Sequence, residues 1–98
     1  MDAICVNDKY DSKTLEVFAK NKIKYPKKDE IVYITRIHKY TLQGGKVGFF
    51  LAGYEGQFIQ DPNTLNINEL SFNSSRFKKL DGTDFLKEDL KKIKELVN

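Results

Sequence analysis

The segment IVYITRIHKYTLQGGKVGFFLAGY, residues 31–54, carries the strongest structural signal in the chain. Its first half, Ile31 to Leu42, is dense in β-branched and aromatic residues, which are typical of a strand. A second run of this kind, Lys46 to Tyr54, follows directly after Gly44 and Gly45. Because glycine adopts the positive φ angles that hairpin turns require, the segment predicts two antiparallel strands joined by a tight turn.

The two glycines followed by Lys46 also resemble a phosphate-binding loop. Such a loop ends in Gly-Lys-Ser/Thr and leads into a helix. Here Val47 stands where the Ser or Thr would be, and the residues after it are strand formers. The stretch is therefore interpreted as a hairpin.

The first strand does not alternate cleanly between apolar and polar residues. In a regular strand Val32 and Ile34 lie on one face and Ile37 on the other. A β-bulge near Thr35 and Arg36 would bring Ile34 and Ile37 to the same side. Without a bulge, one face would meet a barrel interior and the other would be covered by a helix or by the N-terminal loop.

Weaker signals predict the rest of the fold. The apolar run Ala3 to Val6 predicts a buried strand, and one or two helical turns are expected in residues 12–21. Short strands are expected around Phe58 and Ile59 and over Phe77 to Leu80. Side chains expected to point inwards are Phe49 or Phe50, Leu65, Ile67, Leu70, Phe72 and Phe77.

The stretch TDFLKEDLKKIKELVN predicts an amphipathic helix over about residues 83–97. Thr83 or Asp84 would cap it after Gly82. Its apolar positions, spaced to share one helical face, are Leu86, Leu90, Ile93 and Val97. We expect this stripe to pack on the strands; the alternative is that it binds a partner or a second copy of the protein, as a homodimer.

The length of 98 residues predicts one domain over residues 1–98, with strands up to about residue 81. A hydrophobic content of 40% beside 32% charged residues is typical of a soluble folded protein and excludes a disordered one. No apolar run approaches the length of a membrane span, and the first residues lack the features of a signal peptide. We therefore expect a cytoplasmic protein without membrane contact.

Three stretches between Pro26 and Leu80 form a pattern: PKKDEIVYITRI, GKVGFFLAGYEG and FNSSRFKKL. They hold a proline with a polar turn and a strand, then a glycine hairpin, then an Arg-Phe strand after a Ser-rich turn. In this order they resemble small phage and prophage-type proteins, mostly of unknown function, with SH3-like barrels. The resemblance implies a mainly β (α+β) fold, a small SH3-like antiparallel β-barrel with the C-terminal helix added, and it implies no catalytic residues.

The sequence offers few residues for catalysis. Cys5 is the only cysteine and His38 the only histidine, so a Cys-based zinc site is excluded. Cys5 is interpreted as a small buried hydrophobe, although pairing with His38 as a nucleophile stays open. Four carboxylates that could cluster, here interpreted as turn and cap residues, are Asp8, Asp11, Asp29 and Glu30. We therefore expect no enzyme, no cofactor and no metal ion.

Tyrosines are better candidates for a binding surface, because each joins an apolar ring to a polar hydroxyl. Those at loop edges or strand ends are Tyr10, Tyr25, Tyr40 and Tyr54. SH3-like barrels present such aromatic side chains between loops, where they can accept a peptide. We therefore predict a non-enzymatic protein that binds a protein partner, such as a phage-encoded accessory protein or an inhibitor of a host defence protein.

Two alternatives stay open. The net charge of +3 is only mildly basic, but residues 20–28 contain no acidic residue. A nucleic-acid-binding barrel would use the lysines of this stretch for phosphate contacts and Tyr25 for stacking; these are Lys20, Lys22, Lys24, Lys27 and Lys28. The other alternative is a protein that binds or sequesters a small ligand such as a nucleotide.

Overall fold

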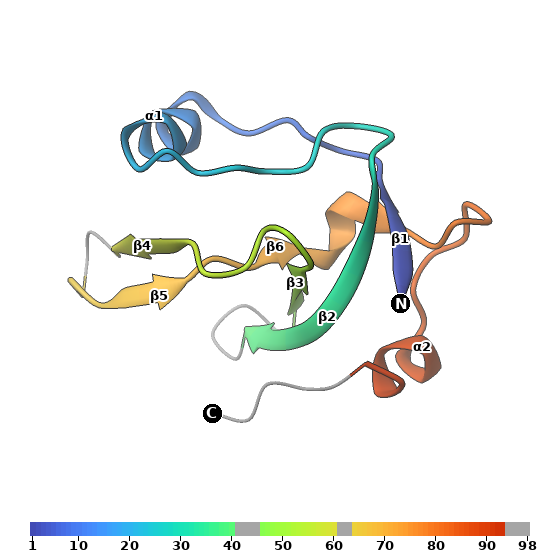
Figure 1. Ribbon diagram of the computed structural model, residues 1–98. Coiled ribbons are helices and arrows are strands. Elements are labelled where there is room, and N and C mark those ends of the chain that lie inside the picture. The colour runs from blue at the N-terminus through green and yellow to red at the C-terminus, as the bar shows by residue number, and fades with distance from the viewer. Residues whose placement is uncertain (41–45, 61–63, 94–98) are drawn as a thin grey trace.

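The computed structural model describes residues 1–40, 46–60 and 64–93. A five-stranded antiparallel sheet has the strand order β6-β3-β2-β1-β7, and β4 pairs with β5 in a second sheet (Figure 1). The strands are β1 (Asp2–Cys5), β2 (Ile31–Tyr40), β3 (Lys46–Leu51), β4 (Phe58–Gln60), β5 (Ile67–Glu69), β6 (Phe72–Asn73) and β7 (Phe77–Lys78). The helices are α1 (Ser12–Lys20) and α2 (Lys87–Lys91), with a 3-10 turn at Ser74–Arg76. The predicted mainly β class is confirmed.

β2 and β3 form the antiparallel hairpin that the sequence predicts. The predicted glycine turn between them lies outside the described residues. The ladder passes from Ile34 to Arg36 on β2 while it advances by one residue on β3, so Thr35 is an extra residue. One extra residue reverses the alternation of faces, and Ile34 and Ile37 are consequently both in the core, at 2% and 3% exposure. Of the two alternatives that the sequence leaves open for this strand, the structure shows the bulge.

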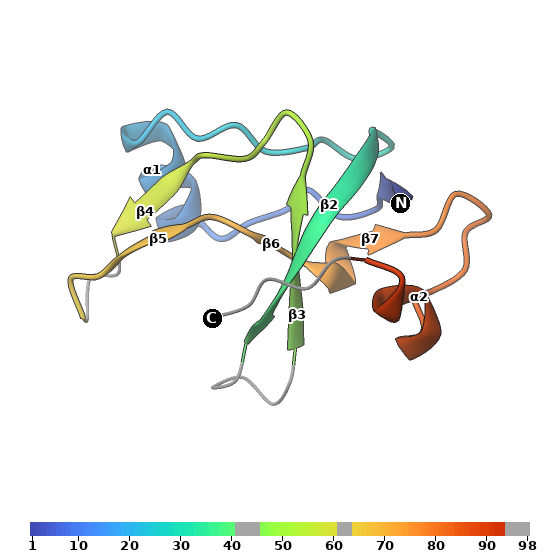
Figure 2. The same ribbon diagram turned by 60° about the horizontal axis from the view of Figure 1, so that its bottom comes forward.

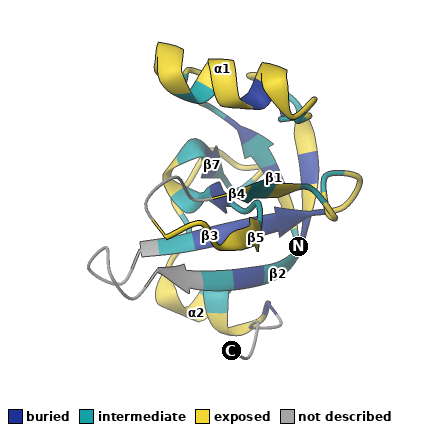
Figure 3. Ribbon diagram, turned by 90° about the vertical axis from the view of Figure 1, so that its left-hand side faces the viewer, coloured by how far each residue is buried: buried dark blue, intermediate teal, exposed yellow. Residues whose placement is uncertain are grey.

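The core lies on one face of the five-stranded sheet. Phe49 is fully buried at its centre, with the rings of Phe77 and Phe85 at 5.8 and 5.2 Å. Along β2 buried residues alternate with less buried ones, whereas residues 48–51 of β3 are all buried (Figure 3). The cluster consists of Ala3, Cys5, Val32, Ile34, Ile37, Phe49, Leu51, Phe72, Phe77 and Ile93. The phenylalanines predicted to be buried are therefore confirmed.

The two edge strands of the five-stranded sheet, β6 and β7, follow one another in the sequence. β6 pairs with β3 and β7 pairs with β1, and only the 3-10 turn separates β6 from β7. Figure 2 shows the segment from β6 to β7 running past the β2–β3 hairpin. Over the described residues no ladder joins β6 to β7, so the sheet is not a closed barrel. The predicted barrel stays a prediction.

The β4–β5 hairpin projects from the sheet (Figure 1). The prediction that Leu65 and Ile67 point inwards is wrong, because their side chains are 68% and 67% exposed. A two-stranded ribbon has no second layer of its own to cover it. Only Leu70, which follows β5, packs against the core as predicted.

The connection from β1 to β2 carries α1, as the sequence predicts. Asp11 caps this helix, and its Oδ1 accepts a hydrogen bond from the Thr14 backbone N–H at 2.7 Å. Phe18 is the only buried residue of the helix. α1 is therefore held to the rest of the molecule mainly through one aromatic ring.

The C-terminal helix begins later than predicted. Residues 83–86 are not helical. Asp81 accepts hydrogen bonds from the Thr83 backbone N–H and hydroxyl, so Thr83 belongs to a turn and does not cap the helix. Asp89 accepts a hydrogen bond from the Leu86 N–H at 2.9 Å, which places the helix start at Lys87. The helix also ends earlier than predicted, at Lys91, and residues 92–93 are not helical. Residues 94–98 lie outside the described part of the chain.

The fold predicts unequal effects of removing two phenylalanine rings. Phe49→Ala should lower the free energy of unfolding by about 3–5 kcal/mol, because it leaves a cavity among buried neighbours. Phe58→Ala removes the same ring from a position that is 55% exposed and should cost less than about 1 kcal/mol. Urea denaturation followed by circular dichroism measures both values, and equal losses would contradict the described core.

Candidate binding groove beside helix α1

Three aromatic rings pack together where α1 meets the long β1–β2 connection. The ring of Tyr10 lies edge-on to those of Phe18 and Tyr25, with centroids at 5.0 and 5.2 Å. Phe18 and Tyr25 are 5.4 Å apart. These are favourable aromatic contacts. The structure thus brings together two of the four predicted tyrosines, and both are half-buried.

Arg76, in the 3-10 turn, ties this aromatic cluster to the sheet. Its guanidinium carbon lies 3.7 Å from the centroid of the Tyr10 ring. Its Nη1 donates hydrogen bonds to the carbonyls of Lys9 and Asn7, at 2.7 and 3.3 Å. Burial raises the pKa of Tyr10 to about 12, and the opposing effect of Arg76 is smaller. The Tyr10 phenol is therefore neutral at physiological pH and leaves the charge of Arg76 uncompensated.

A groove of about 660 Å³ runs between α1 and the segment that links β5, β6 and the 3-10 turn. α1, β4 and this segment all contribute to it, and these parts lie side by side in Figure 1. Its apolar lining consists of Val17, Phe18, Ile59, Leu70 and Phe72. Its polar lining consists of Tyr10, Lys13, Thr14, Ser71, Asn73 and Arg76. Of these eleven residues, only Tyr10 was a site candidate from the sequence.

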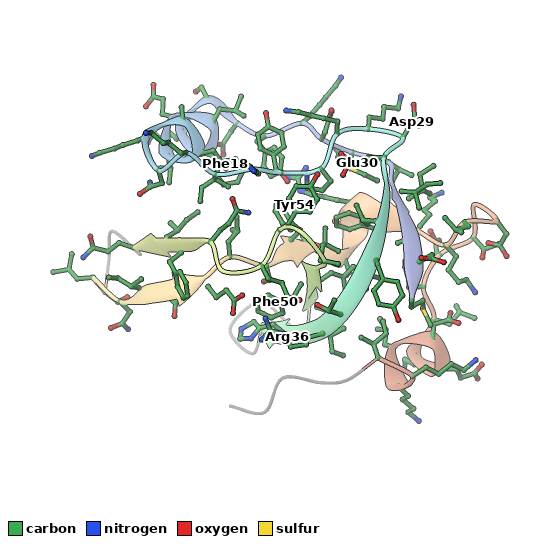
Figure 4. All side chains as sticks on the ribbon, viewed as in Figure 1. Phe18, Asp29, Glu30, Arg36, Phe50 and Tyr54 are labelled. Carbon is green, nitrogen blue, oxygen red and sulfur yellow. The ribbon has the colours of Figure 1, made fainter. Side chains whose placement is uncertain are left out.

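Tyr54 lies next to the groove, but its side chain contacts other residues of the protein. Its hydroxyl donates a hydrogen bond to Glu30 Oε2 at 2.5 Å, and its ring meets the edge of Phe72 at 6.1 Å (Figure 4). Burial and the hydrogen bond to Glu30 raise the pKa of Tyr54 to about 12. A second hollow, of about 550 Å³, joins Tyr54 to Tyr25 and is bordered by Lys24 and Lys27. Two predicted tyrosines and two predicted lysines thus share one depression.

The remaining predicted tyrosine cannot be assigned to the same surface. Tyr40 ends β2 and pairs with Lys46 through the backbone, and its side chain lies outside the described part of the chain. Tyr33 was not a candidate, yet it is one of the exposed aromatic residues. It lies early in β2, beside Asp2 of β1, and lines none of the described hollows.

The five lysines predicted for nucleic acid lie at the end of α1 and along the connection to β2, and all are exposed. None forms an ion pair with a carboxylate of the described residues. The Lys27 ammonium lies 3.7 Å from the centroid of the Tyr25 ring. A base that stacked on this face of Tyr25 would have to displace Lys27, which weakens the predicted stacking role.

A second charged cluster fastens the β4–β5 hairpin to β2. The Arg36 guanidinium lies over the Phe50 ring at 4.2 Å and donates to Glu69 at 3.1 Å, and Glu55 lies at 3.4 Å (Figure 4). Glu69 also accepts a hydrogen bond from the Gly56 N–H at 2.9 Å. Arg36 is paired with both carboxylates within the molecule, so we interpret this cluster as structural.

The other candidate groups for chemistry lie apart from the groove, and most of them make contacts within the protein. Cys5 is buried, its Sγ faces the carbonyls of Asn7 and Pro26, and burial raises its thiol pKa, opposite to an activated nucleophile. His38 lies on β2 against the edge of the Phe50 ring. Among the four carboxylates, Asp11 caps α1, Asp8 accepts from the Lys28 N–H, and Glu30 accepts from Tyr54.

Comparisons with protein-family models, curated proteins and solved structures found no match to this chain. Within residues 1–40, 46–60 and 64–93, no group of three or more His, Cys, Asp or Glu side chains is placed to hold a metal ion. The same residues contain no helix with the length and apolar character of a membrane span. The groove lining is therefore the main basis for assigning a function.

The raised pKa values of Tyr10 and Tyr54 predict a late tyrosine titration. Because both values are about 12 and exceed the ordinary value of 10, their contribution to stability should be complete below pH 10 and lost as the pH rises to 12. Phenolate absorbance against pH should show a late step that Tyr54→Phe reduces. Tyr10→Phe should reduce the same step, because burial raises the pKa of Tyr10 as well. A late step of full size in Tyr54→Phe would contradict the Tyr54–Glu30 hydrogen bond.

Proposed function

We propose that this chain is a non-enzymatic binding protein that holds a short extended segment of a partner protein in the groove beside α1. The observation that carries the proposal is the groove lining, in which five apolar side chains from three separate parts of the chain meet. The volume of about 660 Å³ falls in the usual range of ligand sites. An exposed apolar depression with a polar rim is typical of protein-interaction sites.

The sheet edge at the groove favours an extended segment. β6 is the last strand of the five-stranded sheet and, among the described strands, pairs only with β3. Four consecutive residues that include β6, Leu70 to Asn73, line the groove. An edge strand presents backbone donors and acceptors to which another extended chain can add. The apolar side chains of that chain would lie against Val17 and Phe72.

A small SH3-like barrel is the arrangement that we propose for the strands. The proposal is supported by the position of β6 and β7, which lie at opposite sheet edges and are joined by one 3-10 turn. The resemblance of residues 26–80 to phage and prophage-type proteins points to a phage-encoded accessory protein or an inhibitor of a host defence protein, acting in the cytoplasm.

Nucleic-acid binding is the second candidate. It is favoured by five exposed lysines on residues 20–28 that form no ion pair with described carboxylates. It is weakened by the contact of Lys27 with the Tyr25 ring. These lysines do not line the groove, so substitutions distinguish the two candidates.

A library of random peptides displayed on phage, selected on the immobilised protein, tests the proposed function. We expect enriched peptides that bind wild type and that bind Val17→Asn at least about tenfold more weakly, because an amide replaces apolar lining. Leu15→Asn is the matched control on the same helix. Leu15 is 40% exposed and Val17 is 38% exposed, but Leu15 does not line the groove.

The proposal fails if no peptide is enriched over the bare support, or if both asparagine variants bind the peptides equally. A single-stranded DNA probe provides the comparison with the second candidate. Salt-sensitive DNA binding that is lost in Lys24→Glu and Lys28→Glu, without peptide binding, would establish the nucleic-acid alternative.

A further inference from the structure

The charged side chains that line the groove all carry a positive charge. Two of its eleven residues are charged, Lys13 on α1 and Arg76 in the 3-10 turn, and both are cationic. Among the described residues, no Asp or Glu lines the groove. Lys13 and Arg76 form no ion pair with a carboxylate of the described residues. The charged side chains that a ligand would meet on these walls are therefore all positive.

Two acidic residues lie near the groove but do not line it. Asp8, whose charge affects Tyr10, accepts a hydrogen bond from the Lys28 N–H at 3.0 Å. Asp11 caps α1, and its hydrogen bonds with Thr14, with a smaller contribution from the charge of Lys13, hold the pKa of its carboxyl below the ordinary value. Both carboxylates keep their negative charge, but Lys13 and Arg76 are the charged side chains that a ligand in the groove would meet first.

Arg76 is held in a fixed position with donors to spare. The Tyr10 ring covers one face of the guanidinium, and its Nη1 binds the carbonyls of Asn7 and Lys9. Its Nε and Nη2 donate no hydrogen bond within the described residues. A guanidinium has five N–H donors, and its fork matches a carboxylate through two parallel bonds. Because the side chain is already ordered, binding a carboxylate costs little further conformational entropy.

We infer that the partner segment is acidic: an extended peptide with at least one Asp or Glu carboxylate bound by Arg76, next to a large apolar side chain held among Val17, Ile59 and Phe72. This inference rests on the proposed function and names the chemical class of its partner. Lys13, across the groove on α1, favours a second acidic residue in the same segment. The apolar lining and the sheet edge at β6 select a peptide over a phosphate backbone, which would use charge alone.

The composition of selected peptides tests this inference first. Peptides enriched from the random library should carry Asp or Glu beside Phe, Tyr, Leu or Ile, and should be depleted in Lys and Arg. A fluorescein-labelled peptide from the selection is then compared with a version in which each Asp and Glu is replaced by Asn or Gln. Fluorescence anisotropy should show about tenfold weaker binding of the neutral version, a loss typical of a charge-assisted hydrogen-bonded pair.

Charge variants of the protein locate the effect. Lys13→Glu should weaken the acidic peptide severalfold and leave its neutral version unchanged, since the exposed Lys13 side chain forms no ion pair within the described part of the chain. Lys91→Glu, with the same charge change on α2 at a distance from the groove, is the matched control and should have no effect (Figure 1). Arg76→Lys retains the charge without the fork and should also weaken binding. Circular dichroism establishes that this variant is folded, and Lys13→Glu decides the matter if it is not.

The outcomes separate this inference from the proposed function. Peptides that are sensitive to Val17→Asn but show no acidic preference would overturn the inference and leave the proposed function standing. Equal effects of Lys13→Glu and Lys91→Glu would overturn it as well. If no peptide is enriched, both fall. If single-stranded DNA displaces the labelled peptide from the groove and Lys13→Glu abolishes DNA binding, the occupant is a nucleic acid and the inference is wrong.

Discussion

The extra residue at Thr35 is the constraint on which the rest of the molecule depends. It lets Ile34 and Ile37 both enter the core, which a regular strand would not allow. It also leaves Arg36 on the opposite face, over the Phe50 ring and against Glu69 of β5. That contact fastens the β4–β5 hairpin to the sheet, and the hairpin with the residues after it forms one wall of the groove. A local irregularity in one strand thereby positions a surface far from it in the sequence.

The other wall depends on polar contacts that hold the β1–β2 connection in place. Arg76 bridges the 3-10 turn to Lys9, a residue 67 positions earlier. Tyr54 reaches Glu30, and Gln57 exchanges hydrogen bonds with the backbone of Lys24 at 2.6 and 2.8 Å. α1 itself buries only one ring, so these contacts at both ends of the connection define where the helix lies. The groove is the space left between two separately anchored parts.

The candidate site was only partly foreseeable. Tyr10 was selected because a tyrosine at a loop edge suits a half-exposed surface, and it does line the groove. The sequence does not indicate a role for Arg76, although this residue lies within FNSSRFKKL, because an arginine in a short polar turn carries no local sign of what lies beside it. Leu65 and Ile67 were placed inside for a related reason: hydrophobic spacing shows that a residue could be buried, but not whether another layer is present to cover it.

The sequence by itself determined the strands of the central hairpin and the burial of Phe72 and Phe77, and it offered the bulge as one of two alternatives. These depend on the alternation of side chains along one strand and on turn residues, which are properties of a few neighbouring positions. Only the tertiary structure decided the start of the last helix, the exposure of the β4–β5 hairpin, and the groove with its two cations and no carboxylate. These depend on distances between residues far apart in the chain, such as Lys13, Ile59 and Arg76, and a pattern within one segment holds no information about such distances.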